Sequence, residues 1–111
     1  MEAVHRCLKD EGLFLLHTIG WKETMVTNDP WFERYIFPNS LIPSMKQISA
    51  SIERLFVVED WHNFSADYDA TLIAWFKNFD SGWDKLKEKF DERFYRMWKY
   101  YLLNCAGLFR S

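Results

Sequence analysis

Residues 59–75, Glu-Asp-Trp-His-Asn-Phe-Ser-Ala-Asp-Tyr-Asp-Ala-Thr-Leu-Ile-Ala-Trp, form the stretch on which the expected fold depends. The apolar run that precedes it, residues 56–58, is typical of a β-strand. The first half of the stretch is rich in ionisable side chains, and the second half begins an amphipathic helix. Loop side chains and unpaired helix amides converge where a strand passes into a helix. The stretch is therefore expected to line a ligand site.

A second expected strand lies upstream, at Leu13–Leu16, where four apolar residues follow one another. Such a continuous run is typical of a central strand covered on both faces. It ends at His17, two residues before Ile19 and three before Gly20, and polar groups at this end of a buried strand often bind ligands. A structural role for His17 is the commoner alternative. The alternation of helices and strands predicts an α/β fold with a mostly parallel sheet.

Four helices are expected from hydrophobic periodicity and capping signals. The first covers residues 2–9, and the second covers residues 45–54, where Ser44 and Gln47 form a capping-box pattern. Asp67 or Asp69 is expected to cap a long third helix that runs to residue 90 with a kink or a second cap at residues 81–84. Asp91 is expected to cap the fourth helix, and the last two helices should form an antiparallel pair.

The segment between the first strand and the second helix, residues 21–43, has little periodicity. Its aromatic part, residues 31–37, is expected to be a short helix or irregular. A loop of this length inside a compact domain is often a lid, although a plain surface excursion is the alternative.

The composition, 49% hydrophobic and 27% charged residues, is that of a globular chain with one domain at most. Aromatic residues make up 19%, which fits either an aromatic core or an interface. Residues 1–84 carry 7 basic and 13 acidic side chains, whereas residues 85–111 carry 7 basic and 3 acidic ones. The basic, aromatic last helix is therefore either a solvated face or a surface for an anionic membrane.

Several classes of site are disfavoured by the sequence. The four glycines form no phosphate-binding or dinucleotide-binding motif, and the three histidines have no zinc-binding spacing, so no metal site is expected. The net charge of −2 disfavours nucleic acid as a partner. Cys7 and Cys105 lie far apart with no signal peptide before them, which predicts free thiols in the cytoplasm.

Many short motifs in order resemble the C-terminal part of cyclopropane-fatty-acyl-phospholipid synthases, which are similar to mycolic acid cyclopropane synthases. These motifs are Leu13–Gly20, Tyr35–Asn39, Glu59–Phe64, Ala66–Asp69, Tyr100–Leu102 and Cys105–Gly107. The resemblance implies the C-terminal part of a class I, Rossmann-like methyltransferase fold, with two strands plus a helix-rich aromatic appendage. It also implies an S-adenosylmethionine-dependent enzyme that transfers a methylene group to the cis double bond of an unsaturated phospholipid acyl chain.

The resemblance further implies which residues take part in the reaction. Bicarbonate is the proton acceptor of this family, and its ligands correspond to the side chains of His17 and Tyr68 and the backbone amide of Ile19. An anion of this kind needs hydrogen-bond donors, which an imidazole, a phenol and an amide supply. Cys105 corresponds to the family's active-site cysteine, so the implied catalytic residues are Cys105, His17 and Tyr68. Taken without the resemblance, Cys105 is an inert thiol on an apolar helix stripe.

Other parts of the family pattern are expected outside residues 1–111. These are the glycine-rich cofactor loop, the ribose-binding acid, an upstream glutamate ligand of bicarbonate and the last strand. The chain is therefore expected to be a single partial domain, 1–111, with no cofactor-binding residue and no S-adenosylmethionine binding of its own. Unpaired strand edges could support a homodimer. The expected location is the cytoplasm, peripheral to the inner face of the membrane. The alternatives are a non-enzymatic lipid- or protein-binding module and a truncated, inactive remnant.

Overall fold

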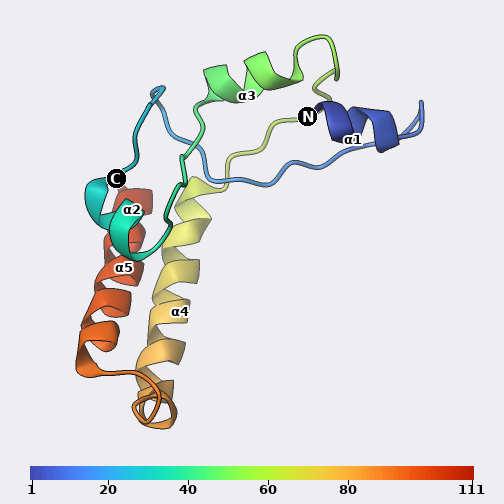
Figure 1. The fold of residues 1–111 in the computed structure, drawn as a ribbon. Helices are drawn as coiled ribbons and strands as arrows, with labels where there is room; N and C mark the ends of the chain where they lie inside the picture. The colour runs from blue at the N-terminus through green and yellow to red at the C-terminus, as the bar shows by residue number, and fades with distance from the viewer. The chain divides into compact units, whose positions relative to one another are not determined.

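A computed structural model describes residues 1–111, which form two compact units, Met1–Trp61 and His62–Ser111. Both units are helical, as Figure 1 shows. The first contains α1 (Glu2–Cys7), α2 (Pro30–Tyr35) and α3 (Met45–Ile52). The second contains α4 (Ser65–Leu86) and α5 (Glu92–Arg110).

The expected α/β fold is wrong, because the chain has five helices and no sheet. The β-type pairing that is present is an isolated parallel bridge between Trp21 and Ser44. A strand is stabilised by hydrogen bonds to a neighbouring strand, and neither of the two expected strands has a neighbouring strand to pair with. Leu13 and Leu15 are 84% and 88% exposed instead of lying in a core. The strand edges through which a homodimer was expected are therefore also absent.

The expected helix after Ser44 is confirmed as α3, and its capping box is complete. The Gln47 amide donates to Ser44 Oγ at 3.2 Å, and the Ser44 amide donates to Gln47 Oε1 at 2.9 Å. Ile48 provides the buried position of this helix. The chain leaves the helix through Arg54, whose φ of 65° ends the right-handed turn. The helix therefore stops at Ile52, two residues before the expected end.

The second unit is the expected antiparallel helix pair, in which α4 and α5 lie side by side (Figure 1). Asp91 caps α5 as expected, since its carboxylate accepts a hydrogen bond from the Phe94 amide at 2.8 Å. Leu72, Leu102 and Ala106 form the buried core of the pair. Burying a leucine side chain contributes about 1.5–3 kcal/mol, and this core contains only two leucines and one alanine. The partly buried aromatic side chains packed around it must therefore supply much of the remaining stabilisation.

Two expected details of α4 are wrong. The helix begins at Ser65, before either expected aspartate cap, and Asn63 Oδ1 accepts the Ser65 amide at 3.0 Å. α4 also runs without interruption through residues 81–84, so the helix is not capped a second time there. Phe79 and Trp83 both pack on Tyr95 of α5, with ring centroids 5.5 and 5.0 Å apart. These contacts lie on both sides of Gly82 and hold the helix together across it.

Candidate functional site

The expected site residues are divided between the two units. His17 and Ile19 belong to the first unit, in an exposed segment without regular structure. The hydroxyl of Thr18 donates a hydrogen bond to the carbonyl of Ile19 at 3.0 Å. This bond involves the carbonyl of Ile19 and not its backbone amide, which is the expected bicarbonate ligand. Tyr68 and Cys105 belong to the second unit and pack against the same buried core of the helix pair.

Tyr68 lies in the first turns of α4 and is partly buried among aromatic rings. Its ring centroid is 5.1 Å from that of Phe109 near the end of α5. Trp75 approaches from two turns along α4 in an edge-to-face geometry, with centroids 6.3 Å apart. Both neighbours present apolar surface, so the ring of Tyr68 is held within an aromatic wall.

Cys105 faces the same interface from α5. Burial raises the pKa of its thiol from 9.0 to about 11. The pKa of Tyr101 is raised as well, mainly by burial and also by its proximity to Cys105 and Tyr68. The thiol and the phenol are therefore neutral at physiological pH. An apolar wall of this kind suits an uncharged ligand better than it suits a thiolate nucleophile.

An ion pair fastens the start of α4 to the end of α5. Arg110 Nε donates to Asp69 Oδ2 at 2.8 Å, and a terminal guanidinium nitrogen donates to Oδ1 at 2.9 Å. The hydrogen bonds from Arg110 lower the pKa of Asp69. The two residues neighbour Tyr68 and Phe109 in the sequence, so the pair holds the ends that carry these rings. The sequence reasoning missed this pair, although the antiparallel register of the helices would have brought the two residues together.

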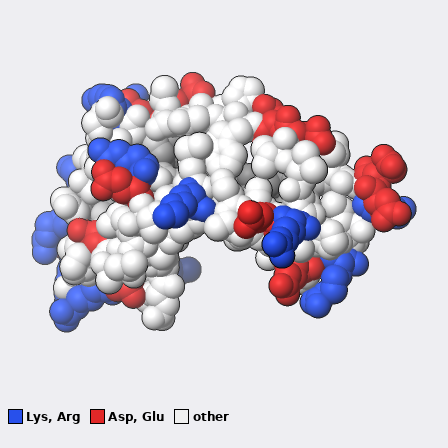
Figure 2. Space-filling model, turned by 90° about the horizontal axis from the view of Figure 1, so that it is seen from above, with Lys and Arg blue, Asp and Glu red and all other residues white.

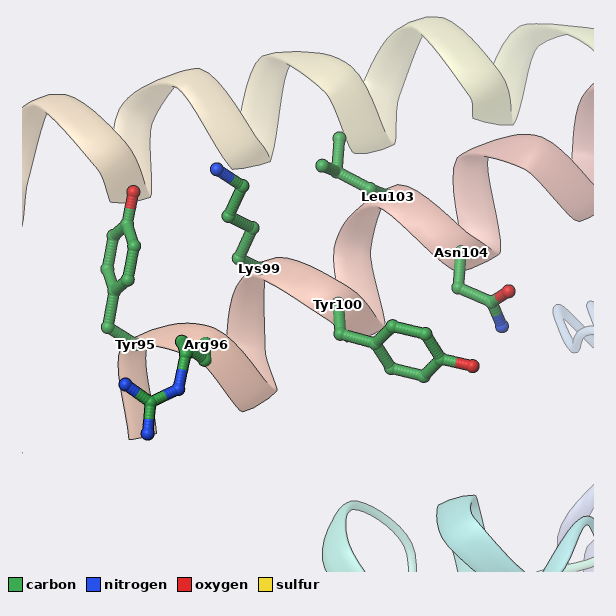
Figure 3. Close-up of a pocket in the computed structure, with 6 residues that line it drawn as sticks. All are labelled: Tyr95, Arg96, Lys99, Tyr100, Leu103 and Asn104. Carbon is green, nitrogen blue, oxygen red and sulfur yellow. The ribbon is translucent and has the colours of Figure 1, made fainter. Parts of the chain in front are cut away.

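A second feature of the helix pair is an open groove of about 600 Å³ along α5. It is lined by Tyr95, Arg96, Lys99, Tyr100, Leu103 and Asn104, which Figure 3 shows as sticks. Lys99 Nζ lies 5.6 Å from the ring centroid of Phe76, within cation–π distance. The Tyr95 hydroxyl donates to Asp80, and this bond raises the pKa of Tyr95. The groove therefore combines two cations with aromatic and aliphatic surface.

The chain contains no group of three or more His, Cys, Asp or Glu side chains that could hold a metal ion. No helix has the length and apolar composition that crossing a membrane requires. The charged side chains on the face shown in Figure 2 lie in small groups among uncharged residues, and several acidic and basic groups adjoin one another.

The sequence matches known proteins along its whole length. The family model described as mycolic acid cyclopropane synthetase matches residues 1–111. A cyclopropane-fatty-acyl-phospholipid synthase from Escherichia coli (strain K12) is 56% identical over 109 residues, which are 98% of this chain and 28% of that protein. A protein of the same name from Citrobacter freundii is 46% identical over 67 residues, 60% of this chain and 75% of that protein. A sphingolipid C9-methyltransferase A from Emericella nidulans is 28% identical over 110 residues, 92% of this chain and 21% of that protein.

Proposed function

Because the chain belongs to the mycolic acid cyclopropane synthetase family, we propose that it is part of an S-adenosylmethionine-dependent enzyme of phospholipid modification. The enzyme would transfer a methylene group to the cis double bond of an unsaturated phospholipid acyl chain. The observation that carries the proposal is the identity to the Escherichia coli synthase across nearly the whole chain. The aromatic wall of the helix pair supports it, because an acyl chain needs apolar surface. The proposed place of action is the cytoplasmic, inner face of the membrane.

S-adenosylmethionine supplies the transferred carbon when it is bound, but residues 1–111 do not fit this cofactor. None of the glycines has a positive φ, and the chain has no strand from which a glycine-rich loop could lead into a helix. We expect isothermal titration calorimetry of the purified chain to show no saturable binding of S-adenosylmethionine. Micromolar binding would contradict this expectation.

The proposed bicarbonate ligands are the side chains of His17 and Tyr68 and the backbone amide of Ile19. Their support is the resemblance together with chemistry, since all three can donate hydrogen bonds to an anion. For Cys105 we propose a neutral role in the aromatic wall, because burial raises its pKa to about 11. A neutral thiol beside an acyl chain adds apolar surface without adding charge.

A chimeric enzyme tests the proposed function. This chain would replace the matching 109 residues of the Escherichia coli synthase, and cyclopropane fatty acids would be measured by gas chromatography after incubation with unsaturated phospholipid. We expect the chimera to make cyclopropane fatty acids. A chimera that folds, as judged by circular dichroism and thermal unfolding, but makes no product would refute the proposal.

Variants of the chimera test the bicarbonate ligands. Tyr68→Phe and His17→Gln should lower activity and raise the bicarbonate concentration needed for half-maximal rate. His62→Gln is the matched control, because His62 stacks on Phe64 at 5.0 Å and is not a proposed ligand. An unchanged bicarbonate dependence in both Tyr68→Phe and His17→Gln would rule out these residues as ligands.

A further inference from the structure

The exposed side of α5 carries basic residues followed by apolar ones. Arg93, Arg96 and Lys99 are exposed and lie three residues apart, and the exposed Tyr100 and Leu103 follow them along α5. Tyr100 is 52% exposed and Leu103 is 37% exposed. No acidic residue occurs from Arg93 to the last residue of the sequence. We call these five residues the α5 stripe.

The central part of the α5 stripe lies in the groove described above. Arg96, Lys99, Tyr100 and Leu103 all line this groove, and no carboxylate lines it. Figure 3 shows Arg96 and Tyr100 pointing away from α4, whereas Lys99 and Leu103 point toward it. Asp80 of α4 accepts the hydrogen bond of Tyr95, which lines one end of the groove. Because Arg96 and Tyr100 point outward (Figure 3), and Lys99 and Leu103 remain exposed beside α4, the groove offers cations and apolar surface to a partner of negative charge.

We propose that the α5 stripe docks on the surface of a bilayer that contains anionic phospholipid. Arg93, Arg96 and Lys99 lie against lipid phosphates, and Tyr100 and Leu103 enter the headgroup region beside them. Helices that lie in a membrane interface combine basic residues with aromatic and leucine side chains in this way. The choice of lipid rests on the proposed function, because an enzyme that modifies phospholipid acyl chains must meet a bilayer. Nucleic acid is disfavoured by the half-exposed leucine and by the net charge of −2.

Vesicle co-sedimentation tests the electrostatic part of the surface. The chain should bind vesicles of phosphatidylcholine mixed with phosphatidylglycerol more strongly than vesicles of phosphatidylcholine alone. The Arg96→Gln/Lys99→Gln variant should lower the partition coefficient by about thirty-fold, which is about five-fold for each charge removed. The control, Lys46→Gln/Lys77→Gln, removes the same charge from exposed positions on α3 and α4. An equal loss in the control variant would show that net charge is responsible and would overturn the proposal.

A second variant and two competitors test the apolar part. Leu103→Ser should weaken binding even at high salt, where the charge variants no longer differ from the unmodified chain. Inorganic phosphate should not displace the chain from vesicles more than chloride does at the same ionic strength. Displacement by phosphate would make the groove a small-anion site, and tighter binding to duplex DNA than to vesicles would make it a nucleic-acid surface. Either result would overturn bilayer docking.

The failure of the docking surface can be distinguished from the failure of the proposed function. In the chimeric enzyme, Arg96→Gln/Lys99→Gln should reduce product formation on vesicles but leave it unchanged on phospholipid dispersed in detergent. Equal activity on both substrates would refute docking through the α5 stripe. If the chimera with the unmodified chain makes no product on vesicles and none on phospholipid in detergent, the proposed function is refuted instead. Circular dichroism of each variant confirms that the exposed substitutions leave the helices intact.

Discussion

We expect Cys105 to react with iodoacetamide more slowly than Cys7, and to react faster with every increase in pH up to about 11. The interface of α4 and α5 partly buries the Cys105 thiol, whereas Cys7 is exposed at the end of α1. Burial raises the pKa of Cys105 from 9.0 to about 11. Since the thiolate is the form that attacks an alkylating reagent, the raised pKa removes most of the reactive species near neutral pH.

The size of the effect follows from the pKa of Cys105. An increase from 9.0 to about 11 lowers the thiolate fraction at neutral pH about 100-fold. A thiolate of higher pKa is also a better nucleophile, and this recovers roughly ten-fold of the rate. The expected net decrease is about ten-fold relative to a thiol of ordinary pKa, and steric shielding by the helix pair adds to it.

Two variants that each keep a single cysteine allow the two alkylation rates to be measured separately. Cys7→Ser leaves Cys105 as the reporter, and Cys105→Ser leaves Cys7. Alkylation would be followed by mass spectrometry over a range of pH at constant ionic strength. The logarithm of the Cys105 rate should rise by about one for each pH unit without a plateau below about pH 10. In urea, which removes the burial, the two thiols should react at similar rates.

A Cys105 rate equal to that of Cys7 in the folded chain would refute this reasoning. A plateau below pH 9 would refute it as well, because it would show that the thiol titrates near or below its ordinary pKa. Either result would favour a reactive cysteine and would strengthen the active-site role that the resemblance implies for Cys105.

Three further predictions concern stability. Leu102→Ala should lower the free energy of unfolding in urea by about 2–5 kcal/mol, because the side chain is 3% exposed in the core. Leu103→Ala, on the exposed side of the same helix, should change it by no more than about 0.5 kcal/mol, and equal losses would contradict the assigned core. Ser44→Ala should cost about 1 kcal/mol, seen as faster hydrogen exchange in α3, and unchanged exchange would contradict the capping role. Burial raises the pKa of both Cys105 and Tyr101, so the folded chain holds these protons more tightly than the unfolded chain. The protonated Cys105 thiol contributes its whole stabilisation of the fold below pH 9.0, and this contribution is lost as the pH rises to about 11. A midpoint of urea unfolding that stays constant over this pH range would contradict the prediction.

The helix pair could be predicted from the sequence because its determinants are local. The apolar stripe of each helix repeats every three or four residues, and Asp91 lies directly before the last helix. The predicted second cap at residues 81–84 was wrong for a reason that is not local. The aromatic contacts of Phe79 and Trp83 with Tyr95 hold α4 together across Gly82, and they depend on the other helix.

The candidate site divides in the same way. Tyr68 and Cys105 pack on the same core of the helix pair, but the sequence placed only Cys105 on an apolar stripe and grouped Tyr68 with His17 and Ile19. The bond between Asp69 and Arg110 does not follow from either helix alone, because it depends on the register that brings the start of α4 to the end of α5. The raised pKa of Cys105 likewise depends on burial by the partner helix. Sequence patterns therefore indicate which residues share a helix face, and the register between helices decides their chemistry.

The failed prediction of strands shows the physical limit of an apolar run as evidence. A helix forms its hydrogen bonds within one segment, so its periodicity contains most of the information that it needs. A strand forms them with another segment, and an apolar run says nothing about whether that segment is available. Exposure along residues 13–16 alternates, at 84%, 40%, 88% and 41%, as expected for side chains on opposite sides of an extended backbone. An apolar run of this kind therefore predicts an extended local conformation, and the sheet that would bury it depends on a partner that the run does not specify.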